Sequence, residues 1–542
     1  MVSSHDTLPR LDERARGWLR FIWDKATTPD DWSSGGEPNP WWDTYSTPPM
    51  CSLGRFDLHE TGYVLPVMCD LTPAWREGYA RIADELVGRY TTFWAAVDWL
   101  TAIGPDPNQA NYPPLWQAYL PEFLRGSYDT PGWTANGVAP WGLQPDPIGA
   151  DGNNFFRGFF NLLIGFYDYV AGDDKWASPF KVTGYQDRLF DWDRHSIVNF
   201  MVDQWDERPA GVHCENTKIW PFCVSGAGLG LQLYDQLHGK DTHYLFGRWV
   251  EYARQHYMKT NRRGEITSFT FYYDPLQRAH VTLRDDVSAY ASLAVTPYVV
   301  PQDREFGEFL YTSSVRRLGW DDPRQPVVQL SPDPRFLLIA LVVARELGDH
   351  ETEARLRAVA ERDFEPRFFG PDDDMFGWFF GNGEPWPRGQ LASLMMLSEL
   401  GEPGAWSRVF NEPNRAKFDQ PTVSGVDYPR LGIAQAWNAP DAGVLWVETY
   451  AATTEARGTR TTFSVTQLPH ASEVQISCDG VEFAHWRPAG PDSIEITTTV
   501  DAHRFRIVTG YHGPDPTART ATSAITTPGS VYPASACGGS CC

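Results

Sequence analysis

Two cysteines, Cys214 and Cys223, stand nine residues apart in the segment GVHCENTKIWPFC. Zinc-binding pairs usually lie about two to four residues apart, so this spacing does not indicate a zinc site. A free thiol has a reference pKa of about 8.5 and can exchange a proton with a substrate. A free cysteine is also among the most buried residue types and often serves packing alone. The spacing by itself leaves both interpretations open.

Four aspartates are further candidates for proton chemistry: Asp43 in WWDTY, Asp146 before a proline, and the neighbours Asp285 and Asp286. A carboxyl has a reference pKa near 4, and burial raises that pKa toward neutrality. A buried Asp43 is therefore a possible proton donor, although a carboxylate there can also cap a helix or order a loop. Asp146 has the same two interpretations. Asp285 and Asp286 open a predicted helix, where the helix dipole favours them as capping residues.

Several short motifs for catalytic, metal or nucleotide sites are absent or incomplete in this sequence. The chain contains neither a G-x-S-x-G elbow nor a Walker loop. The string HETGY at 59–63 lacks the second histidine of a zinc-protease helix. Gly226, Gly228 and Gly230 do not follow a strand, so they indicate close helix packing and not a nucleotide site. The acidic run 372–374 is interpreted as a solvated loop.

The elements that must position these residues are mostly helical up to about residue 400. Apolar residues recur at steps of three and four, and the loops between them are rich in Pro, Gly, Asp and Asn. With no obvious strand alternation, this pattern favours an α/α toroid over a parallel-sheet fold. Helices are expected at 9–25, 73–103, 153–171, 185–205, 223–238, 241–260, 285–299, 333–348, 350–362 and 387–399.

The composition and residue pattern of the chain change near residue 430. Six short segments rich in Val, Ile and Thr and bounded by turn residues predict a small β-sandwich over 431–511. Residues 512–542 are small, polar and proline-containing, and they end in ACGGSCC. We expect this tail to be disordered. The predicted organisation is a toroid over 1–430, a β-rich domain over 431–511 and a flexible tail.

Two segments resemble the linalool dehydratase/isomerase family. They are DPIGADGNNFFRGFFNLLIGFYDYVAG at 146–172 and GVHCENTKIWPFCVSGAGLGLQLYDQLHGKD at 211–241. Shorter similarities are SAY at 288–290 and ARELGD at 344–349, and the resemblance runs over about residues 40–400. It implies an (α/α)6 barrel, a ring of subunits, and chemistry on an apolar alcohol without a cofactor or metal.

The same resemblance implies site residues. The catalytic set is Asp43, Cys214 and Cys223, and the substrate-binding set is Tyr45, His59, Phe155, Phe159 and Tyr290. Tyr45 and His59 are placed loosely, since His59 falls about where the family has a tyrosine. Phe159 replaces a pocket histidine of the family and Phe155 replaces a methionine, which puts linalool itself in doubt. Glu215, beside Cys214, is either a pocket acid or the partner of a basic residue.

The expected function is a lyase or isomerase that protonates the hydroxyl of a terpenoid-like alcohol, takes a proton from carbon, and dehydrates, isomerises or cyclises its substrate. Aromatic faces would stabilise the developing cation. The alternative is a glycoside-active enzyme with paired carboxylates and tryptophan platforms in a helical toroid. A binding protein without chemistry is the third possibility.

The composition of the chain limits the classes of molecule that it is expected to bind. A formal net charge of −23 argues against nucleic acid and against an anionic membrane surface. The sequence contains no signal-peptide core and no run of 18 apolar residues, so the expected location is the cytoplasm. Eight cysteines do not make a disulfide framework. Cys537, Cys541 and Cys542 suit a soft metal ion, but a tail without a role is the simpler interpretation.

Overall fold

The computed structural model describes residues 7–43, 54–100, 138–139, 142–214, 218–275, 278–329, 333–381 and 384–516. The chain is mainly α-helical with several β-sheets. Its α-helices are α1 (Glu13–Thr27), α2 (Gly54–Thr61), α3 (Val64–Leu71), α4 (Glu77–Tyr90), α5 (Val97–Leu100), α8 (Asn154–Ala171), α9 (Arg194–Asp206), α10 (Pro221–His238), α11 (Tyr244–Tyr252), α12 (Asp285–Gln302), α13 (Arg304–Arg317), α14 (Arg335–Leu347), α15 (His350–Asp363), α16 (Gly389–Glu399) and α17 (Ala405–Asn411).

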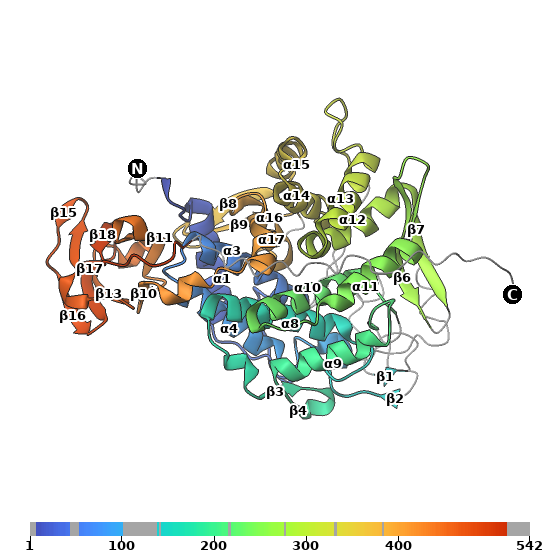
Figure 1. The fold of residues 1–542 in the computed structure, drawn as a ribbon, viewed down its shortest axis with the longest axis horizontal. Helices are drawn as coiled ribbons and strands as arrows, with labels where there is room; N and C mark the ends of the chain where they lie inside the picture. The colour runs from blue at the N-terminus through green and yellow to red at the C-terminus, as the bar shows by residue number, and fades with distance from the viewer. Residues whose placement is uncertain are drawn as a thin grey trace, which may run out of the picture.

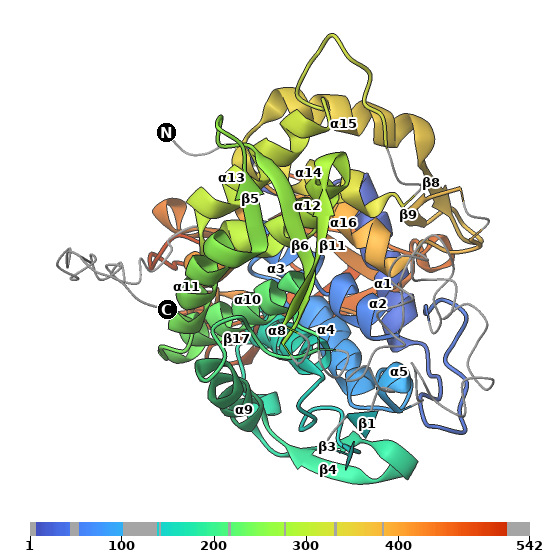
Figure 2. The ribbon, with the colours of Figure 1, turned by 90° about the vertical axis from the view of Figure 1, so that its right-hand side faces the viewer.

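Six helices contact one another in a cycle. α2 packs on α8, α8 on α10, α10 on α12, α12 on α14, α14 on α16, and α16 returns to α2. The cycle can be followed in Figure 2. Other helices pack outside it: α4 and α9 on α8, α11 on α10, α13 on α12, and α15 on α14.

α8 and α10 form the most extensive helix pair, and glycines allow their close approach. A Cβ atom on Gly158 would lie 2.8 Å from the Cβ of Ala227, and one on Gly226 would clash with the Phe159 ring. The interpretation of the glycine run as a packing device is confirmed. Both helices end at a glycine in the left-handed region, Gly172 at φ 75° and Gly239 at φ 63°, a conformation that glycine adopts without strain.

Short antiparallel sheets interrupt the helical part, which the sequence analysis did not predict. They pair β1 (Val138–Ala139) with β2 (Gly142–Leu143), β3 (Phe180–Thr183) with β4 (Leu189–Trp192), β5 (Met258–Thr260) with β6 (Ile266–Asp274) and β7 (Ala279–Arg284), and β8 (Glu365–Phe369) with β9 (Met375–Phe379).

Three helix predictions were wrong in their bounds as a result. The helix expected at 185–205 begins only at Arg194, because β4 occupies its first part. The helix expected at 241–260 ends at Tyr252 and passes through a π-turn into β5. The helix expected at 73–103 is divided into α4 and α5, while α2, α3, α13 and α17 were not predicted.

The C-terminal part forms two antiparallel sheets, at the left of Figure 1. One has the order β10-β13-β17-β16 and the other the order β11-β12-β18-β14-β15. Phe463 and Phe505 join the two sheets with ring centroids 5.5 Å apart. The strands are β10 (Thr422–Ser424), β11 (Leu431–Ala439), β12 (Val444–Ala451), β13 (Arg460–Thr466), β14 (Gln475–Cys478), β15 (Val481–Glu482), β16 (Trp486–Gly490), β17 (Ser493–Thr499) and β18 (Arg504–Val508).

Among the described residues, no helix is both long enough and apolar enough to cross a membrane. The tail from residue 517 onward, with its three cysteines, lies outside the described residues.

Candidate functional site

Both predicted cysteines meet the first turn of α8. The backbone N–H of Phe155 donates a hydrogen bond to Cys214 Sγ at 3.1 Å. The neighbouring Asn154 donates from its side-chain amide to the carbonyl of Cys223 at 3.4 Å. Both cysteines are buried and neither forms a disulfide.

A tight turn fixes Cys214. The backbone of Cys214 exchanges two hydrogen bonds with that of Lys218, with N···O distances of 2.5 and 3.0 Å. Lys218 is anchored in turn by a buried ion pair with Asp274 at 2.6 Å. Cys223 is positioned differently, because it lies in the first turn of α10, which Pro221 opens. Cys214 thus contacts α8 through its thiol and Cys223 through its backbone carbonyl, from separate elements.

A cluster of aromatic rings lies beside the thiols. Phe155 and Phe159 of α8 lie 6.1 and 5.6 Å, centroid to centroid, from Phe222, which precedes Cys223. Phe222 meets the Tyr298 ring of α12 edge to face at 5.2 Å. The His59 ring of α2 stacks on Phe159 at 4.3 Å. Three predicted residues, Phe155, Phe159 and His59, are therefore brought together around the start of α8.

A chain of hydroxyl groups continues from His59. Tyr63 Oη lies 3.0 Å from His59 Nδ1 and 2.9 Å from Tyr298 Oη. His59 Nε2 is buried and has no hydrogen-bond partner among the described residues. Burial and the nearby Arg55 hold the pKa of His59 well below its usual value, so the imidazole is neutral at pH 7. The neutral ring can accept or relay a proton.

Glu60, next to His59, is a buried carboxyl in the same region. Its Oε1 accepts a hydrogen bond from Gln390 of α16 at 3.2 Å, and its Oε2 has no partner among the described residues. Burial raises the pKa of Glu60 to about 8, so the group is mostly protonated at pH 7. Burial chiefly, with contributions from Glu60 and Cys223, also raises the pKa of Tyr298. Tyr298 is thus within electrostatic reach of both groups.

Asp43 is held by an ion pair that the sequence did not predict. Arg388, just before α16, donates from Nη2 to Asp43 Oδ1 at 3.0 Å and from Nε to both carboxylate oxygens at 3.2 Å. The backbone N–H of Asp43 donates to Asp57 Oδ2 at 2.9 Å. Asp57 also forms a fully buried ion pair with Lys25 at 2.7 Å. These bonds connect Asp43 to α1, α2 and α16.

Three predicted site residues remain: Tyr290, Tyr45 and Glu215. None of the described contacts joins them to the cluster of aromatic rings. Tyr290 is buried on α12, eight residues before Tyr298, and its ring packs against Phe336 at 4.4 Å and Trp320 at 6.4 Å. Tyr45 and Glu215 lie outside the described residues. Their places in the site remain predictions.

Asp146, Asp285 and Asp286 are candidate carboxylates for a glycosidase, and each has hydrogen-bond or ion-pair partners of its own. Asp146 accepts hydrogen bonds from the backbone of Ile148 at 2.9 Å and from Trp192 Nε1 at 3.0 Å, so it orders a turn. Asp285 and Asp286 are exposed in the first turn of α12, where both pair with Arg317. Their first-turn position suits the helix dipole, as expected, but the start of α12 has no capping hydrogen bond from a side chain.

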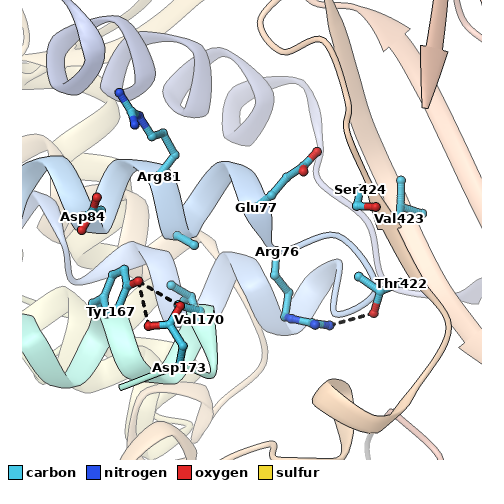
Figure 3. A pocket seen from close by; sticks show the side chains of 12 residues that line it. Arg76, Glu77, Arg81, Asp84, Tyr167, Val170, Asp173, Thr422, Val423 and Ser424 are labelled. Carbon is cyan, nitrogen blue, oxygen red and sulfur yellow. Dashed lines mark hydrogen bonds between the residues drawn. The ribbon is translucent and has the colours of Figure 1, made fainter. Parts of the chain in front are cut away.

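Two surface pockets lie elsewhere. Figure 3 shows the larger, of about 320 Å³, which residues of α4, the end of α8 and β10 line. In it, Arg76 donates to Thr422 Oγ1 at 3.2 Å and Tyr167 donates to Asp173 at 2.9 Å. The second pocket is lined by Trp23, Trp75 and Tyr428, among others. Neither pocket contains a predicted site residue.

The segment that carries the two thiols has a known counterpart. Residues 134–370 match the family model of linalool dehydratase/isomerase. The resemblance stated from the sequence is therefore confirmed for that segment. It includes Cys214, Cys223, Phe155, Phe159 and the whole of α12. The linalool dehydratase/isomerase match leaves α2 and the C-terminal sheets outside.

Solved structures with low similarity include two glycoside hydrolases. One is the GH127 beta-L-arabinofuranosidase of Geobacillus stearothermophilus T6, at 11% identity, with 90% of this chain and 80% of that chain covered and a TM-score of 0.21. The other is a GH127 beta-arabinofuranosidase, at 10% identity, with 83% and 74% covered and a TM-score of 0.20. At these TM-scores the likeness carries no argument about fold or chemistry.

The sequence analysis missed Glu60, Tyr63, Phe222 and Tyr298. A signal was present for one of them, since Tyr63 lies one helical turn after His59. It was overlooked because α2, which ends two residues before Tyr63, buries Arg55, Asp57 and Glu60 and shows no apolar periodicity. Phe222 and Tyr298 looked like ordinary core residues.

Proposed function

We propose that the protein is a cofactor-independent lyase or isomerase that acts on an apolar, terpenoid-like alcohol. The observation that carries the proposal is that the segment matching linalool dehydratase/isomerase contains both cysteines. They contact the first turn of α8, Cys214 through its thiol and Cys223 through its backbone carbonyl, beside a cluster of rings. The match supports a lyase or isomerase reaction. The rings around Phe159 suit an apolar substrate.

The proposed architecture is an (α/α)6 barrel over residues 1–430 with a small β-sandwich over 431–511. The cyclic contacts of α2, α8, α10, α12, α14 and α16 support an inner ring of six helices. The contact of Phe463 with Phe505 supports a sandwich of two sheets. Such a barrel presents the starts of its inner helices at one end, where the substrate would enter. Assembly into a ring of subunits and a cytoplasmic location belong to the same proposal.

The first step is protonation of the substrate hydroxyl, which then leaves as water. Asp43 and Glu60 are the two candidate donors. We assign the donation to Glu60, because its neutral carboxyl carries a proton at pH 7 and has one oxygen without a partner. Asp43, paired with Arg388, is assigned to positioning that end of the site.

The second step is loss of a carbon-bound proton from the allylic cation, which gives an additional C=C bond. The faces of Phe155, Phe159 and Phe222 would stabilise the cation before that loss. Cys214 or Cys223 would relay this proton: the thiol would give its S–H proton to the Glu60 carboxylate left by the first step and take the carbon-bound proton in its place, which restores both groups. Addition of the released water to the other end of the allylic cation would instead give an isomeric alcohol.

A product assay tests the proposal. The purified full-length protein is incubated with linalool, a tertiary allylic alcohol, and with its primary allylic isomer, and the products are identified by gas chromatography and mass spectrometry. The proposal predicts a triene or the transposed alcohol, formed in the presence of a chelator. Hydrolysis of an aryl arabinofuranoside, with no conversion of any terpenoid alcohol, would contradict it and favour the glycosidase alternative.

A further inference from the structure

We propose that Cys478, Asp479 and His503, in the C-terminal sheets, form a binding site for a zinc ion. Asp479 Oδ2 lies 3.0 Å from His503 Nδ1 and 3.5 Å from Cys478 Sγ. The three ligand atoms all lie within 4.8 Å of one another. This cluster, the Cys-Asp-His triad, is remote in sequence from the thiols at α8 and serves no step of the proposed reaction.

The backbone brings the triad together from two connections. β14 ends at Cys478, and Asp479 and Gly480 make the turn into β15 with φ of 53° and 81°. His503 precedes β18, whose Phe505 pairs with Cys478 across the sheet. The N–H of Arg504 donates to Asp479 Oδ1 at 2.9 Å. That bond orients the carboxylate so that Oδ2 faces the imidazole and the thiol.

The second nitrogen of His503 also has a partner. Its Nε2 lies 2.8 Å from Thr499 Oγ1. Donation of the Nε2–H to Thr499 leaves the lone pair of Nδ1 directed at the other two ligands. Metal-binding histidines are oriented in this way by a hydrogen bond on the ring nitrogen that does not bind the metal. The Cys-Asp-His triad therefore contains its metal ligands and a hydrogen-bond partner, Thr499, that orients the histidine.

The ligand types and spacing fit zinc. Zinc binds sulfur, nitrogen and oxygen ligands at about 2.0–2.3 Å, which places tetrahedral ligands about 3.3–3.6 Å apart. The distances from Asp479 Oδ2 are 3.0 Å, just below that range, and 3.5 Å, within it, and all three ligand atoms lie within 4.8 Å of one another, so rotation of the side chains would complete the geometry. Calcium and magnesium prefer oxygen ligands alone and do not suit the thiol and imidazole. The Asp479 side chain is 54% exposed, which leaves room for the ion and for water as a fourth ligand.

A bound ion would join the β14–β15 turn to the connection between β17 and β18. These strands lie at the end of the molecule opposite α12 and β7 (Figure 1). The ion would thus stabilise the folded C-terminal sheets, because a ligand that binds only the folded state raises its stability. Turnover at the α8 thiols should not change.

The test uses the full chain with Cys537, Cys541 and Cys542 replaced by Ser, so that tail thiols cannot bind the metal. Cobalt(II) is titrated as a spectroscopic substitute, and zinc affinity is measured by calorimetry. We expect one ion per chain, a thiolate-to-cobalt charge-transfer band, and a higher melting temperature with zinc. Cys478→Ser should abolish the band, and Asp479→Asn and Thr499→Val should weaken zinc binding at least about tenfold.

The matched control is His485→Gln, an exposed histidine of the same sheets, to be compared with His503→Gln. Circular dichroism and the melting temperature without metal establish that each variant is folded. Asp479→Asn is the conservative variant, since Asn tolerates the left-handed conformation of this turn. The proposal is overturned if no charge-transfer band forms, if the band survives Cys478→Ser, or if His485→Gln weakens binding as much as His503→Gln.

Discussion

Glu60, near the end of α2, and Asp43, whose backbone is bonded to Asp57 of α2, are two carboxyls with opposite surroundings. Asp43 faces the Arg388 guanidinium, whereas Glu60 is buried with one neutral amide partner, Gln390. A group that donates a proton near pH 7 needs a pKa close to that value. Burial gives Glu60 this property, and the ion pair gives Asp43 a fixed position.

Glu60→Gln is expected to lower kcat/KM for an alcohol substrate by about 100-fold or more, because the amide has no acidic proton. In the unaltered protein, kcat/KM should fall as pH rises above about 8, where Glu60 loses its proton.

The raised pKa of Glu60 also means that the folded state holds a proton that the unfolded state has lost between about pH 4.5 and 8. The free energy of unfolding should therefore decrease with rising pH in that window.

Glu60→Gln should flatten this dependence, which chemical denaturation at several pH values measures. Gln390→Leu is the companion variant, since it removes the amide partner and keeps the carboxyl. An unchanged pH profile and full turnover in Glu60→Gln would assign the proton donation to another group.

Phe159 is the residue at which the sequence departs most clearly from the family pattern. Phe159→His should change the product distribution or extend turnover to a smaller, more polar alcohol, because an imidazole adds a polar anchor among the rings that surround position 159. Product analysis with a panel of alcohols measures the effect. If substrate range and products are the same as for the unaltered protein, Phe159 does not line the substrate site.

The resemblance to a known family predicted part of this site. The cysteine segment was found because its spacing and flanking residues resemble that family, and the structure places both cysteines against the first turn of α8. The roles of Glu60 and Tyr298 depend on burial and on contacts between residues more than 200 positions apart, which no local pattern encodes.

At the scale of elements, the packing of α8 on α10 supports the site, because both helices carry its residues at their first turns. Gly158→Ala should lower the free energy of unfolding by about 1–3 kcal/mol, since the added methyl would lie 2.8 Å from Ala227 in a packed interface. Chemical denaturation measures the change.

Gly247→Ala is the matched control for Gly158→Ala. Gly247 lies in α11 with open space around its Cα, so alanine should raise stability by about 0.5–1 kcal/mol through its higher helix propensity. Equal effects of the two substitutions would show that close packing at Gly158 does not matter.

The elements themselves were only partly predictable. Long helices with a regular apolar period, such as α8 and α14, were placed within a few residues. β5, which begins at Met258, was missed because the whole segment 241–260 was assigned to one helix that continues the apolar period of α11. α2 was missed because its Asp57 is buried in an ion pair with Lys25 of α1. A buried charged residue cannot be recognised from the hydrophobicity of the sequence.

At the scale of the whole molecule, the tail should be dispensable for turnover. Pro514 and Pro516 accept hydrogen bonds from Gln420 and Asn414, so the described fold uses the chain up to residue 516. A protein without residues 517–542 should therefore keep its melting temperature and its kcat. Loss of turnover in a truncated protein that is still folded would show that the tail takes part in the chemistry.

The central claim is that the two thiols at α8 act in proton transfer. The most direct measurement is turnover of an allylic alcohol by Cys214→Ala, Cys223→Ala and Cys69→Ala, with folding of each variant verified by its melting temperature. Cys69 is also free and fully buried, but it lies in α3, apart from the ring cluster. Whichever of the first two variants removes the thiol that carries the proton is predicted to lose about 100-fold or more in kcat/KM, and Cys69→Ala to retain it. Full turnover by a folded Cys214→Ala/Cys223→Ala double variant would contradict the proposed chemistry.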